Sequence, residues 1–287
     1  MSIKQRGSGW SIKLVYNLYK LFGYTFIYYL MYPVSYFYYL KAKDVKEALS
    51  IYYQQIGQEF TPKVHHEHLR HFAICMCDRF VSSISPEHYN FDIENADELQ
   101  NNLQKGGILL LSHYGGWASS ANCFGSLNLK INIVMQEVLM QGIKDIENSI
   151  KSKKESYIHI IDTKKGGITV TLEIANALSA NELVAMMGDR ATSDKGKKGV
   201  LFFGKEGYFN KNPFEIAYKM DKPLISLFIS YVKPQCYKID YIKLAMNKEC
   251  RMDEEVNRCM KIYANRFEMN INNYPQGWFN FYDFWEK

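Results

Sequence analysis

The sequence lacks several of the patterns by which common protein classes are recognised. Its six cysteines form no Cys-x-x-Cys pair. Because no secretory cleavage site follows the start, we expect reduced thiols in a cytosolic setting. Gly-x-Ser-x-Gly, a phosphate-binding P-loop and Gly-x-Gly-x-x-Gly are also absent. A disulfide scaffold, a serine-nucleophile hydrolase and a nucleotide-binding enzyme therefore have no positive support.

The sequence also has only a small excess of one charge over the other. The chain has 35 Lys and Arg against 30 Asp and Glu, which gives a net charge of +5. This mild excess favours anionic head groups or an acidic carrier, and it is too small to indicate nucleic acid as a partner. With 287 residues, 47% of them hydrophobic and 23% charged, the chain is long and apolar enough for one large folded domain.

Aromatic residues, by contrast, are abundant. They make up 15% of the chain, and 22 of them are Tyr, a side chain that favours boundaries between water and lipid. The run Leu21–Leu40 contains no charged residue and lies between Lys20 and Lys41. As a helix it would be about 30 Å long, which matches the hydrocarbon core of a bilayer.

The composition of this run argues against a helix that spans the membrane. Seven of its twenty residues are Tyr, whose hydroxyls lack partners at the bilayer centre, and Pro33 interrupts the middle. We therefore predict that residues 1–42 form kinked, membrane-facing helices that anchor the chain at the interface. A spanning helix and a helix simply packed on the domain are the alternatives. Residues 43–287 are predicted to form one α/β domain.

The rest of the chain alternates between helical and extended segments. Residues 44–80 are predicted to be helical. Further helices are predicted at Ala96–Lys105, Gly167–Leu178 and Pro213–Met220, and short apolar segments typical of strands lie at Ile108–Leu111, Asn132–Met135, Ile158–Ile161, Leu183–Met187, Val200–Phe203 and Pro223–Ser230. Strands that alternate with helices favour an α/β fold with a mostly parallel central sheet covered by helices.

Four histidines crowd one predicted helix, at His65, His66, His68 and His71. A metal site would pair the last two at a spacing of three residues. No Asp or Cys nearby completes a tetrahedral set of ligands, so we interpret the group as packed or solvated histidines and expect no metal.

A further histidine follows a buried strand. Ile108–Leu111 leads into Ser112 and His113, and Gly115 and Gly116 then allow a tight turn. Open α/β sheets bind ligands at the carboxyl ends of their strands. Histidine exchanges a proton near neutral pH, which suits a general base. The alternative is an ordinary histidine in a loop.

The residues around this histidine resemble a known motif. Ser112–Trp117 is similar to the His-Phe-Gly-Asn-Trp-Glu block of the late lipid A biosynthesis acyltransferases. These enzymes belong to the lysophospholipid acyltransferase-like superfamily, which is marked by His-x4-Asp/Glu. Segments that resemble other parts of the family stand in the same order along the chain, at Arg6–Ser8, Gly188–Arg190, Gly199–Gly204, Asn212–Pro223 and Tyr274–Tyr282.

The resemblance implies a reaction and a place of action. A histidine removes a proton from a hydroxyl or amine of a lipid or glycolipid acceptor, which attacks the thioester of an acyl carrier protein or acyl-CoA. No metal or bound cofactor is required. His113 is the implied base, and the implied location is the cytoplasmic face of a bacterial inner membrane, as a peripheral or monotopic protein. The substrate contacts we expect are Gly115, Gly116, Trp117, Arg190, Phe203 and Gly204.

Asp189 and Arg190 follow the predicted strand Leu183–Met187, at the same sheet edge as His113. Asp189 is a catalytic candidate because its carboxylate can orient an imidazole and balance its charge. Arg190 can hold a phosphate or carboxylate through two parallel hydrogen bonds. The alternative is that the pair only caps the turn. Gly204 either permits close approach to a ligand or merely ends a strand.

One position departs from the family pattern, because Ala118 stands where the motif has Asp or Glu. A methyl group cannot accept a hydrogen bond, and loss of an orienting carboxylate can cost about 10⁴-fold in rate. Three explanations are open. Another group orients His113, the acid has been replaced in an inactivated variant, or the protein has kept the fold and lost the chemistry. The candidate replacements are a backbone carbonyl, Ser119, Ser120, Glu137 and Asp189.

Two predicted loops are rich in lysine. They contain Lys151, Lys153 and Lys154, and Lys195, Lys197 and Lys198. Solvated lysines are one interpretation, and docking of an acidic carrier protein or an anionic lipid is the other. The sequence thus predicts a lipid acyltransferase, with a non-catalytic lipid- or carrier-binding protein on the same scaffold as the alternative.

Overall fold

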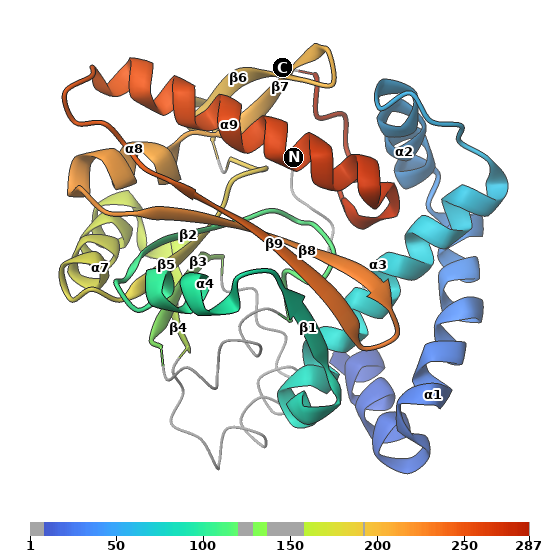
Figure 1. Cartoon of the computed structure of the whole chain (residues 1–287). Helices are drawn as coiled ribbons and strands as arrows, with labels where there is room; N and C mark the ends of the chain where they lie inside the picture. Colours follow the sequence, from blue (N-terminus) through green and yellow to red (C-terminus); the bar gives the residue numbers. More distant parts are fainter. Residues whose placement is uncertain (1–8, 120–128, 137–157, 192, 287) are drawn as a thin grey trace.

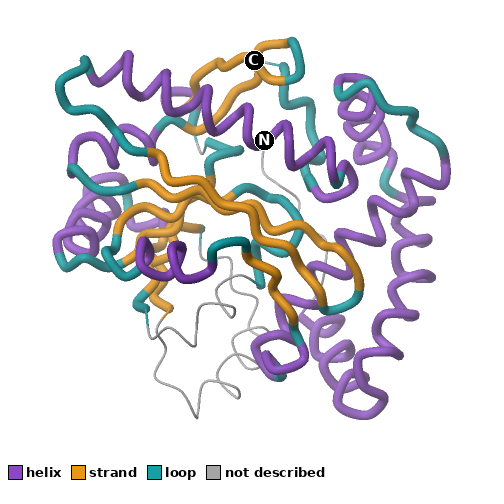
Figure 2. Tube along the Cα trace, viewed as in Figure 1, coloured by secondary structure: helices purple, strands orange, loops and turns teal. Residues whose placement is uncertain are grey.

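The computed structural model describes residues 9–119, 129–136, 158–191 and 193–286. Within them the central feature is a seven-stranded sheet in the order β1-β9-β8-β2-β5-β3-β4 (Figures 1 and 2). Its strands are β1 (Asn90–Ile93), β2 (Gly107–Leu111), β3 (Ile131–Met135), β4 (Ile158–Asp162), β5 (Leu183–Met187), β8 (Leu224–Lys233) and β9 (Cys236–Leu244). All neighbouring pairs are parallel except β8 and β9. The predicted α/β fold with a mostly parallel sheet is confirmed.

Helices cover both faces of this sheet. The helices are α1 (Gly9–Lys41), α2 (Lys43–Gln55), α3 (Pro62–Ile84), α4 (Ala96–Leu103), α7 (Gly167–Ser179), α8 (Asn212–Met220) and α9 (Met252–Asn273). Residues of α7, α8 and α9 share one core cluster with the sheet, and residues of α1, α3 and α4 share the other. In Figure 1, α9 and α4 accordingly lie on opposite sides of the strands.

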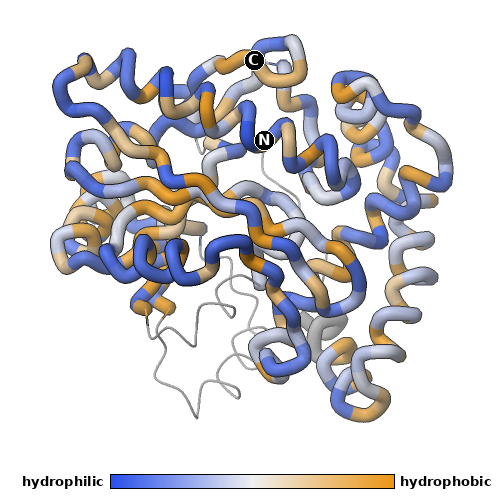
Figure 3. The backbone as a smooth tube through the Cα atoms, in the orientation of Figure 1, coloured by the Kyte–Doolittle hydropathy of each residue, from blue (hydrophilic) through white to orange (hydrophobic). Residues whose placement is uncertain are grey.

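The sequence of β2 explains why the sheet is buried on both faces. Successive side chains of a strand point to opposite faces. Ile108 and Leu110 enter the cluster under α9, while Leu109 and Leu111 enter the cluster under α3. A strand that contacts core on both sides needs a continuous apolar run, which is what the central strands show in Figure 3.

A separate antiparallel hairpin consists of β6 (Lys197–Phe202) and β7 (Lys205–Asn210). The two residues between the strands, Phe203 and Gly204, have φ angles of 51° and 78°. Positive φ at both positions of a two-residue loop is the geometry that matches the twist of a hairpin. The hairpin follows β5 directly and packs its Phe202 and Phe209 into the core under α9.

Helix α1 packs on α3 through one face only. Ile27, Met31 and Ser35 are buried, at spacings of four residues that place them on one side of the helix. The predicted kink is present. The backbone leaves helical geometry at Gly23, where φ is 74° and ψ is −176°, whereas Pro33 lies inside the helix. Glycine adopts this conformation without the steric cost that other residues incur.

The opposite side of α1 is exposed and apolar. It carries large side chains at helical spacing, and we call this set the α1 apolar face: Leu21, Phe22, Phe26, Tyr29, Tyr32, Tyr36, Phe37 and Leu40. None of the helices in the described ranges combines the length and the hydropathy needed to cross a membrane. A face of this kind on a monomer marks a surface that meets a partner or a lipid interface.

Two of the four histidines of α3 lie in the protein interior. His65 and His68 are buried, and burial lowers the pKa of His68 to about 3 and that of His65 to about 4. His68 Nδ1 is hydrogen-bonded to the hydroxyl of Tyr53. No group of side chains within the described residues is arranged to hold a metal ion. His65 and His68 are therefore packed histidines.

Candidate active site

His113 and Asp189 are brought together by the register of two neighbouring strands. Strands β2 and β5 are parallel, and Leu111 is paired with Met187. His113 and Asp189 each lie two residues beyond that pair, so the register extends past the ends of the strands. His113 Nδ1 lies 3.0 Å from Asp189 Oδ1. The sheet edge predicted from the sequence thus holds the two side chains in contact.

The carboxylate of Asp189 is held by three donors. Its Oδ2 accepts from the backbone N–H of His113 at 2.9 Å and from the indole Nε1 of Trp278 at 3.0 Å, and Oδ1 accepts from the imidazole. The side chain is 3% exposed, against 23% for His113. Burial alone would raise the pKa of Asp189, but the interactions with His113, Arg190 and Trp278 outweigh it and lower the pKa. Asp189 is therefore an ionised acceptor.

This geometry determines what the imidazole can do. An ionised carboxylate at Nδ1 keeps the ring proton on that nitrogen, so Nε2 is left as the acceptor. In the described part of the chain no group is hydrogen-bonded to Nε2. The ring lies 5.5 Å from the ring of Trp117, measured between centroids, and Trp117 in turn lies 5.9 Å from Phe279. A partly exposed base beside aromatic surface can meet an amphiphilic substrate.

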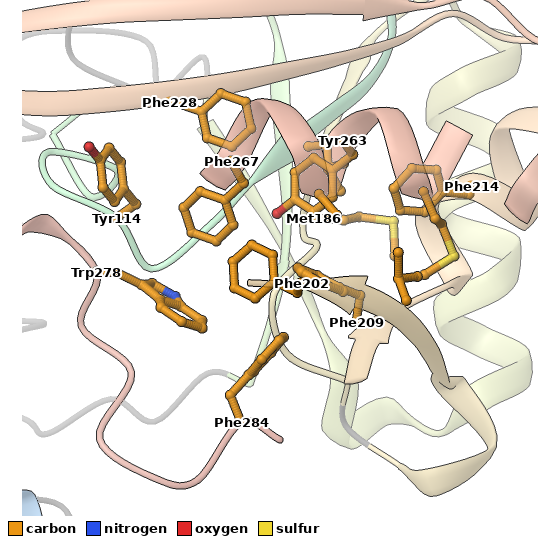
Figure 4. Packing of buried hydrophobic residues seen from close by; sticks show 14 of the residues in the cluster. Tyr114, Met186, Phe202, Phe209, Phe214, Phe228, Tyr263, Phe267, Trp278 and Phe284 are labelled. Carbon is orange, nitrogen blue, oxygen red and sulfur yellow. The ribbon is translucent and has the colours of Figure 1, made fainter. Parts of the chain in front are cut away.

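The segment after α9 closes over the histidine loop. Trp278 pairs with Tyr114 as an isolated antiparallel bridge, and the N–H of Phe279 donates to the carbonyl of His113 at 2.8 Å. Trp278 is fully buried among aromatic side chains that include Phe202 and Phe284 (Figure 4). The rigid packing of the indole fixes the direction of its N–H toward Asp189. The sequence placed Trp278 in a segment that resembles the family but did not predict this bond, because a hydrogen bond across 89 positions has no local signal.

The two glycines of the motif are explained by packing. Gly115 has a φ of 53°, and a Cβ there would lie 1.9 Å from the carbonyl oxygen of Ile229. A Cβ on Gly116 would lie 2.6 Å from the ring of Tyr237. Their N–H groups donate to the carbonyls of Gly277 and Ile229. These amides are already bonded within the protein, so the predicted contact of the glycines with substrate would not use them as donors.

Arg190 lies next to the pair and has donor capacity to spare. Its guanidinium carbon is 4.8 Å from the ring centre of Tyr282. The Nε atom is buried and has no hydrogen-bond partner among the described residues. Tyr282 also lies near Asp189, since its hydroxyl is 3.5 Å from the Asp189 carbonyl oxygen. The structure thus joins the predicted Asp189 and Arg190 to His113 at one sheet edge.

Phe203 and Gly204 are held elsewhere by their own contacts. The N–H of Phe203 donates to Glu268 of α9, and its carbonyl accepts from Gln55 of α2. Within the described residues, no hydrogen bond or ring contact joins either residue to His113. Their conformation serves the hairpin turn, and a role in substrate binding stays a prediction.

Position 118 lies in the turn that follows the glycines. Among the groups that the sequence offered as replacements for the missing acid, Asp189 is the one bonded to His113. Ser119 is buried, and its Oγ has no hydrogen-bond partner among the described residues. Ser120 and Glu137 lie outside the described residues. The geometry favours the explanation in which another carboxylate orients His113.

One of the predicted lysine loops lies within the described residues. Lys197 forms an ion pair with Asp194 at 2.8 Å, and Lys198 Nζ lies 3.5 Å from the carbonyl oxygen of Asp253. Lys195 is exposed in the same loop. Lys151, Lys153 and Lys154 lie outside the described residues. Docking of a carrier on either loop stays a prediction.

Comparison with known proteins gives the class and then the family. The model of the bacterial lipid A biosynthesis acyltransferases matches residues 35–287. The class of this protein is thus a lipid acyltransferase. More narrowly, the chain belongs to the bacterial lipid A biosynthesis acyltransferase family, as the resemblance of its motifs predicted.

Two further comparisons add less. Curated proteins yield no match. Among solved structures, the chain is similar to the 1-acyl-sn-glycerophosphate (LPA) acyltransferase PlsC from Thermotoga maritima. The two share 12% sequence identity with a TM-score of 0.40, over 85% of this chain and 97% of that one.

Proposed function

We propose that this protein transfers a fatty acyl chain from the thioester of an acyl carrier protein or coenzyme A to a hydroxyl or amine of a lipid or glycolipid acceptor. The observation that supports the proposal most strongly is the contact between His113 and Asp189. It supplies a base with an orienting acid in a chain whose motif lacks the usual acid at position 118. Membership of the family supports the reaction class.

The proposed reaction uses Nε2 of His113 twice. Nε2 takes the proton of the acceptor hydroxyl as its oxygen attacks the thioester carbonyl, and the charge of Asp189 stabilises the imidazolium. The tetrahedral intermediate then collapses, the carbon–sulfur bond breaks, and the thiolate leaves. The imidazolium returns the proton to that sulfur, so the protein ends in its starting state with an ester and a free thiol as products.

Two neighbours are assigned supporting roles. Arg190 binds an anionic group of a substrate, because its buried Nε lacks a partner within the described residues and a guanidinium recognises phosphate or carboxylate well. Trp117 lies against His113 and offers aromatic surface to the acyl chain or the lipid. A location at the cytoplasmic face of the inner membrane, as a peripheral or monotopic protein, is part of the proposal, and the exposed side chains of the α1 apolar face support it.

The experiment is acyl transfer in a purified system. The protein is incubated with radiolabelled acyl carrier thioester and a membrane lipid extract, and labelled lipid is separated by chromatography. We expect transfer by the parent chain, a complete loss in His113→Ala, and a loss of about 10⁴-fold in Asp189→Asn. Thermal unfolding of each variant shows whether it folds. Transfer by His113→Ala at the parental rate would contradict the proposal.

The alternative is a non-catalytic lipid- or carrier-binding protein, and the alanine at position 118 is what favours it. The same experiment separates the two. A parent chain that transfers nothing to any lipid in the extract, yet binds lipid or carrier, would establish the alternative. A difference between the parent and His113→Ala in product formation would exclude it.

A further inference from the structure

A guanidinium without an acidic partner lies where α3 meets α1. Arg70 of α3 donates from Nη1 to the hydroxyl of Tyr28 at 3.1 Å. Its guanidinium carbon lies 4.2 Å from the ring centre of Tyr32 and 5.5 Å from that of Tyr28. Within the described ranges no Asp or Glu forms an ion pair with it. Among the described residues, the guanidinium thus meets the rings of Tyr28 and Tyr32 and the hydroxyl of Tyr28.

This environment leaves part of the hydrogen-bonding capacity of the guanidinium unused. Arg70 is half-buried, and its Nε is buried with no hydrogen-bond partner among the described residues. Rings attract a cation through their electron-rich faces, but a partly desolvated charge gains more from an anion that also accepts its hydrogen bonds. Helix α1 cannot supply one, because it contains no Asp or Glu from Gly9 to Lys41. Since no carboxylate among the described residues forms an ion pair with the guanidinium, the site is suited to an anionic ligand.

The surroundings indicate what kind of anion that is. Tyr32 lies under the guanidinium and is also part of the α1 apolar face, where it is 40% exposed. One helical turn on either side of it, Tyr29 is 63% exposed and Tyr36 is 52% exposed. A small soluble anion would use the cation and leave this surface bare. A lipid with an anionic head group would use both, since its acyl chains cover the apolar side chains.

We propose that Arg70, together with Tyr28 and Tyr32, binds the phosphate of an anionic membrane lipid whose acyl chains lie against the α1 apolar face. The site is formed by α1 and α3 and is separate from the His113–Asp189 pair. It rests on the prediction that α1 faces the membrane, and it does not depend on acyl transfer. The two proposals can therefore fail independently.

The test measures vesicle binding by the full chain. Protein is floated with vesicles of phosphatidylcholine alone and with vesicles of phosphatidylcholine mixed with phosphatidylglycerol. The parent chain is expected to prefer the anionic vesicles, and Arg70→Gln is expected to lose about tenfold of that preference. The control is Arg251→Gln, which removes one positive charge from an arginine that is 80% exposed and lies beside Glu254.

The outcomes distinguish binding at Arg70 from a general electrostatic attraction to anionic vesicles. An equal loss of preference in Arg70→Gln and Arg251→Gln would overturn the proposal, because net charge alone would then explain binding. Competition by soluble glycerol phosphate that abolishes the preference of the parent chain would also overturn it, since the ligand would then be a free phosphate. Should Arg70→Gln fail to fold, Tyr32→Leu serves in its place. It keeps the surface apolar and removes the ring, so anionic preference should fall while binding to phosphatidylcholine persists, and an unchanged preference would refute the site.

Discussion

The imidazole Nδ1 of His113 lies 3.0 Å from Oδ1 of Asp189, although 76 positions separate the two residues in the chain. The contact arises because β2 and β5 are adjacent, parallel and in register, so the residues that follow each strand meet at one edge. In the proposed reaction, this acid orients the ring in place of an acid five residues after His113. The alanine there is then compatible with catalysis.

The indole of Trp278 is expected to contribute to catalysis through its single N–H group. Trp278→Phe keeps an aromatic ring and removes the bond to Asp189, so the acyl-transfer rate should fall about tenfold. Because that bond helps to lower the pKa of Asp189, the acid limb of the pH–rate profile should also move to higher pH. The rate is measured as a function of pH.

A matched control exists in the same cluster. Trp285 donates from its indole to the carbonyl of Phe202 at 3.1 Å and makes no bond to Asp189. Trp285→Phe should therefore leave the acid limb in place, even if it lowers stability. A profile that moves equally in both variants would show that aromatic packing, and not the bond to Asp189, is responsible.

Placing the acid of the motif at position 118 tests whether its absence lowers the rate of acyl transfer. If Asp189 already orients His113, Ala118→Glu should change the transfer rate by less than about tenfold, because a second carboxylate adds little to an ionised one in place. Single-turnover rates of the parent and the variant are compared. A gain of about a thousandfold or more would show that the parent lacks its orienting acid, and that Asp189 does not serve in its place.

A second buried carboxylate should govern how stability depends on pH. Asp78 of α3 is fully buried and accepts from the hydroxyls of Tyr89 and Tyr237. Burial raises its pKa to about 6, against an ordinary value of 3.8, although the tyrosine hydrogen bonds oppose the rise. The protonated carboxyl is thus favoured in the folded state. Its contribution is complete below pH 3.8 and is lost as the pH rises through about 6.

Asp78→Asn removes this titration and keeps the shape of the side chain. The free energy of unfolding of the variant, relative to that of the parent, should therefore increase by about 3 kcal/mol between acid and neutral pH. Denaturant unfolding across this pH range measures the difference. A difference that does not vary with pH would mean that Asp78 is not a buried acid of raised pKa.

The α1 apolar face should determine membrane binding. Leu21, Phe22 and Phe37 are 74%, 59% and 57% exposed, so replacing all three by Ser should leave the fold intact and weaken vesicle binding at least about tenfold. These changes are cleaner than deletion of residues 1–42, which would also uncover the face of α3 that packs on Ile27. Vesicle flotation measures the effect.

Two exposed apolar side chains elsewhere on the molecule provide the control. Ile168 and Leu172 of α7 are 82% and 58% exposed, and their replacement by Ser should not change vesicle binding. Equal losses from α1 and α7 would mean that exposed apolar area, and not its location on α1, directs the protein to the membrane.

The central strands were predictable because burial on both faces requires an unbroken apolar run. Ile108–Leu111 and Leu183–Met187 were found in this way, and with them the edge that holds His113 and Asp189. Strand β9 was missed, because Lys238, Asp240 and Lys243 interrupt its apolar residues. The long helix α9 was also missed, as was the antiparallel pairing of β8 with β9.

The site residues that could be predicted from the sequence are those with reactive side chains directly after a predicted strand. His113, Asp189 and Arg190 each follow an apolar strand, and that position marked them. The bond from Trp278 to Asp189 depends on how the closing segment folds back, which no local pattern reports. The kink at Gly23 was not located from the sequence, because Pro33 is the stronger local signal although glycine adopts the required φ.

The tautomer of His113 tests the central claim most directly. Long-range ¹H–¹⁵N correlation spectra of the histidine-labelled protein, with the His113 signals assigned by comparison with His113→Gln, report which ring nitrogen carries the proton in the neutral form. The contact with Asp189 predicts a protonated Nδ1 and an unprotonated Nε2, with this preference lost in Asp189→Asn. A neutral His113 protonated at Nε2 in the parent protein would contradict the account, because that nitrogen could not then accept a proton from an acceptor hydroxyl.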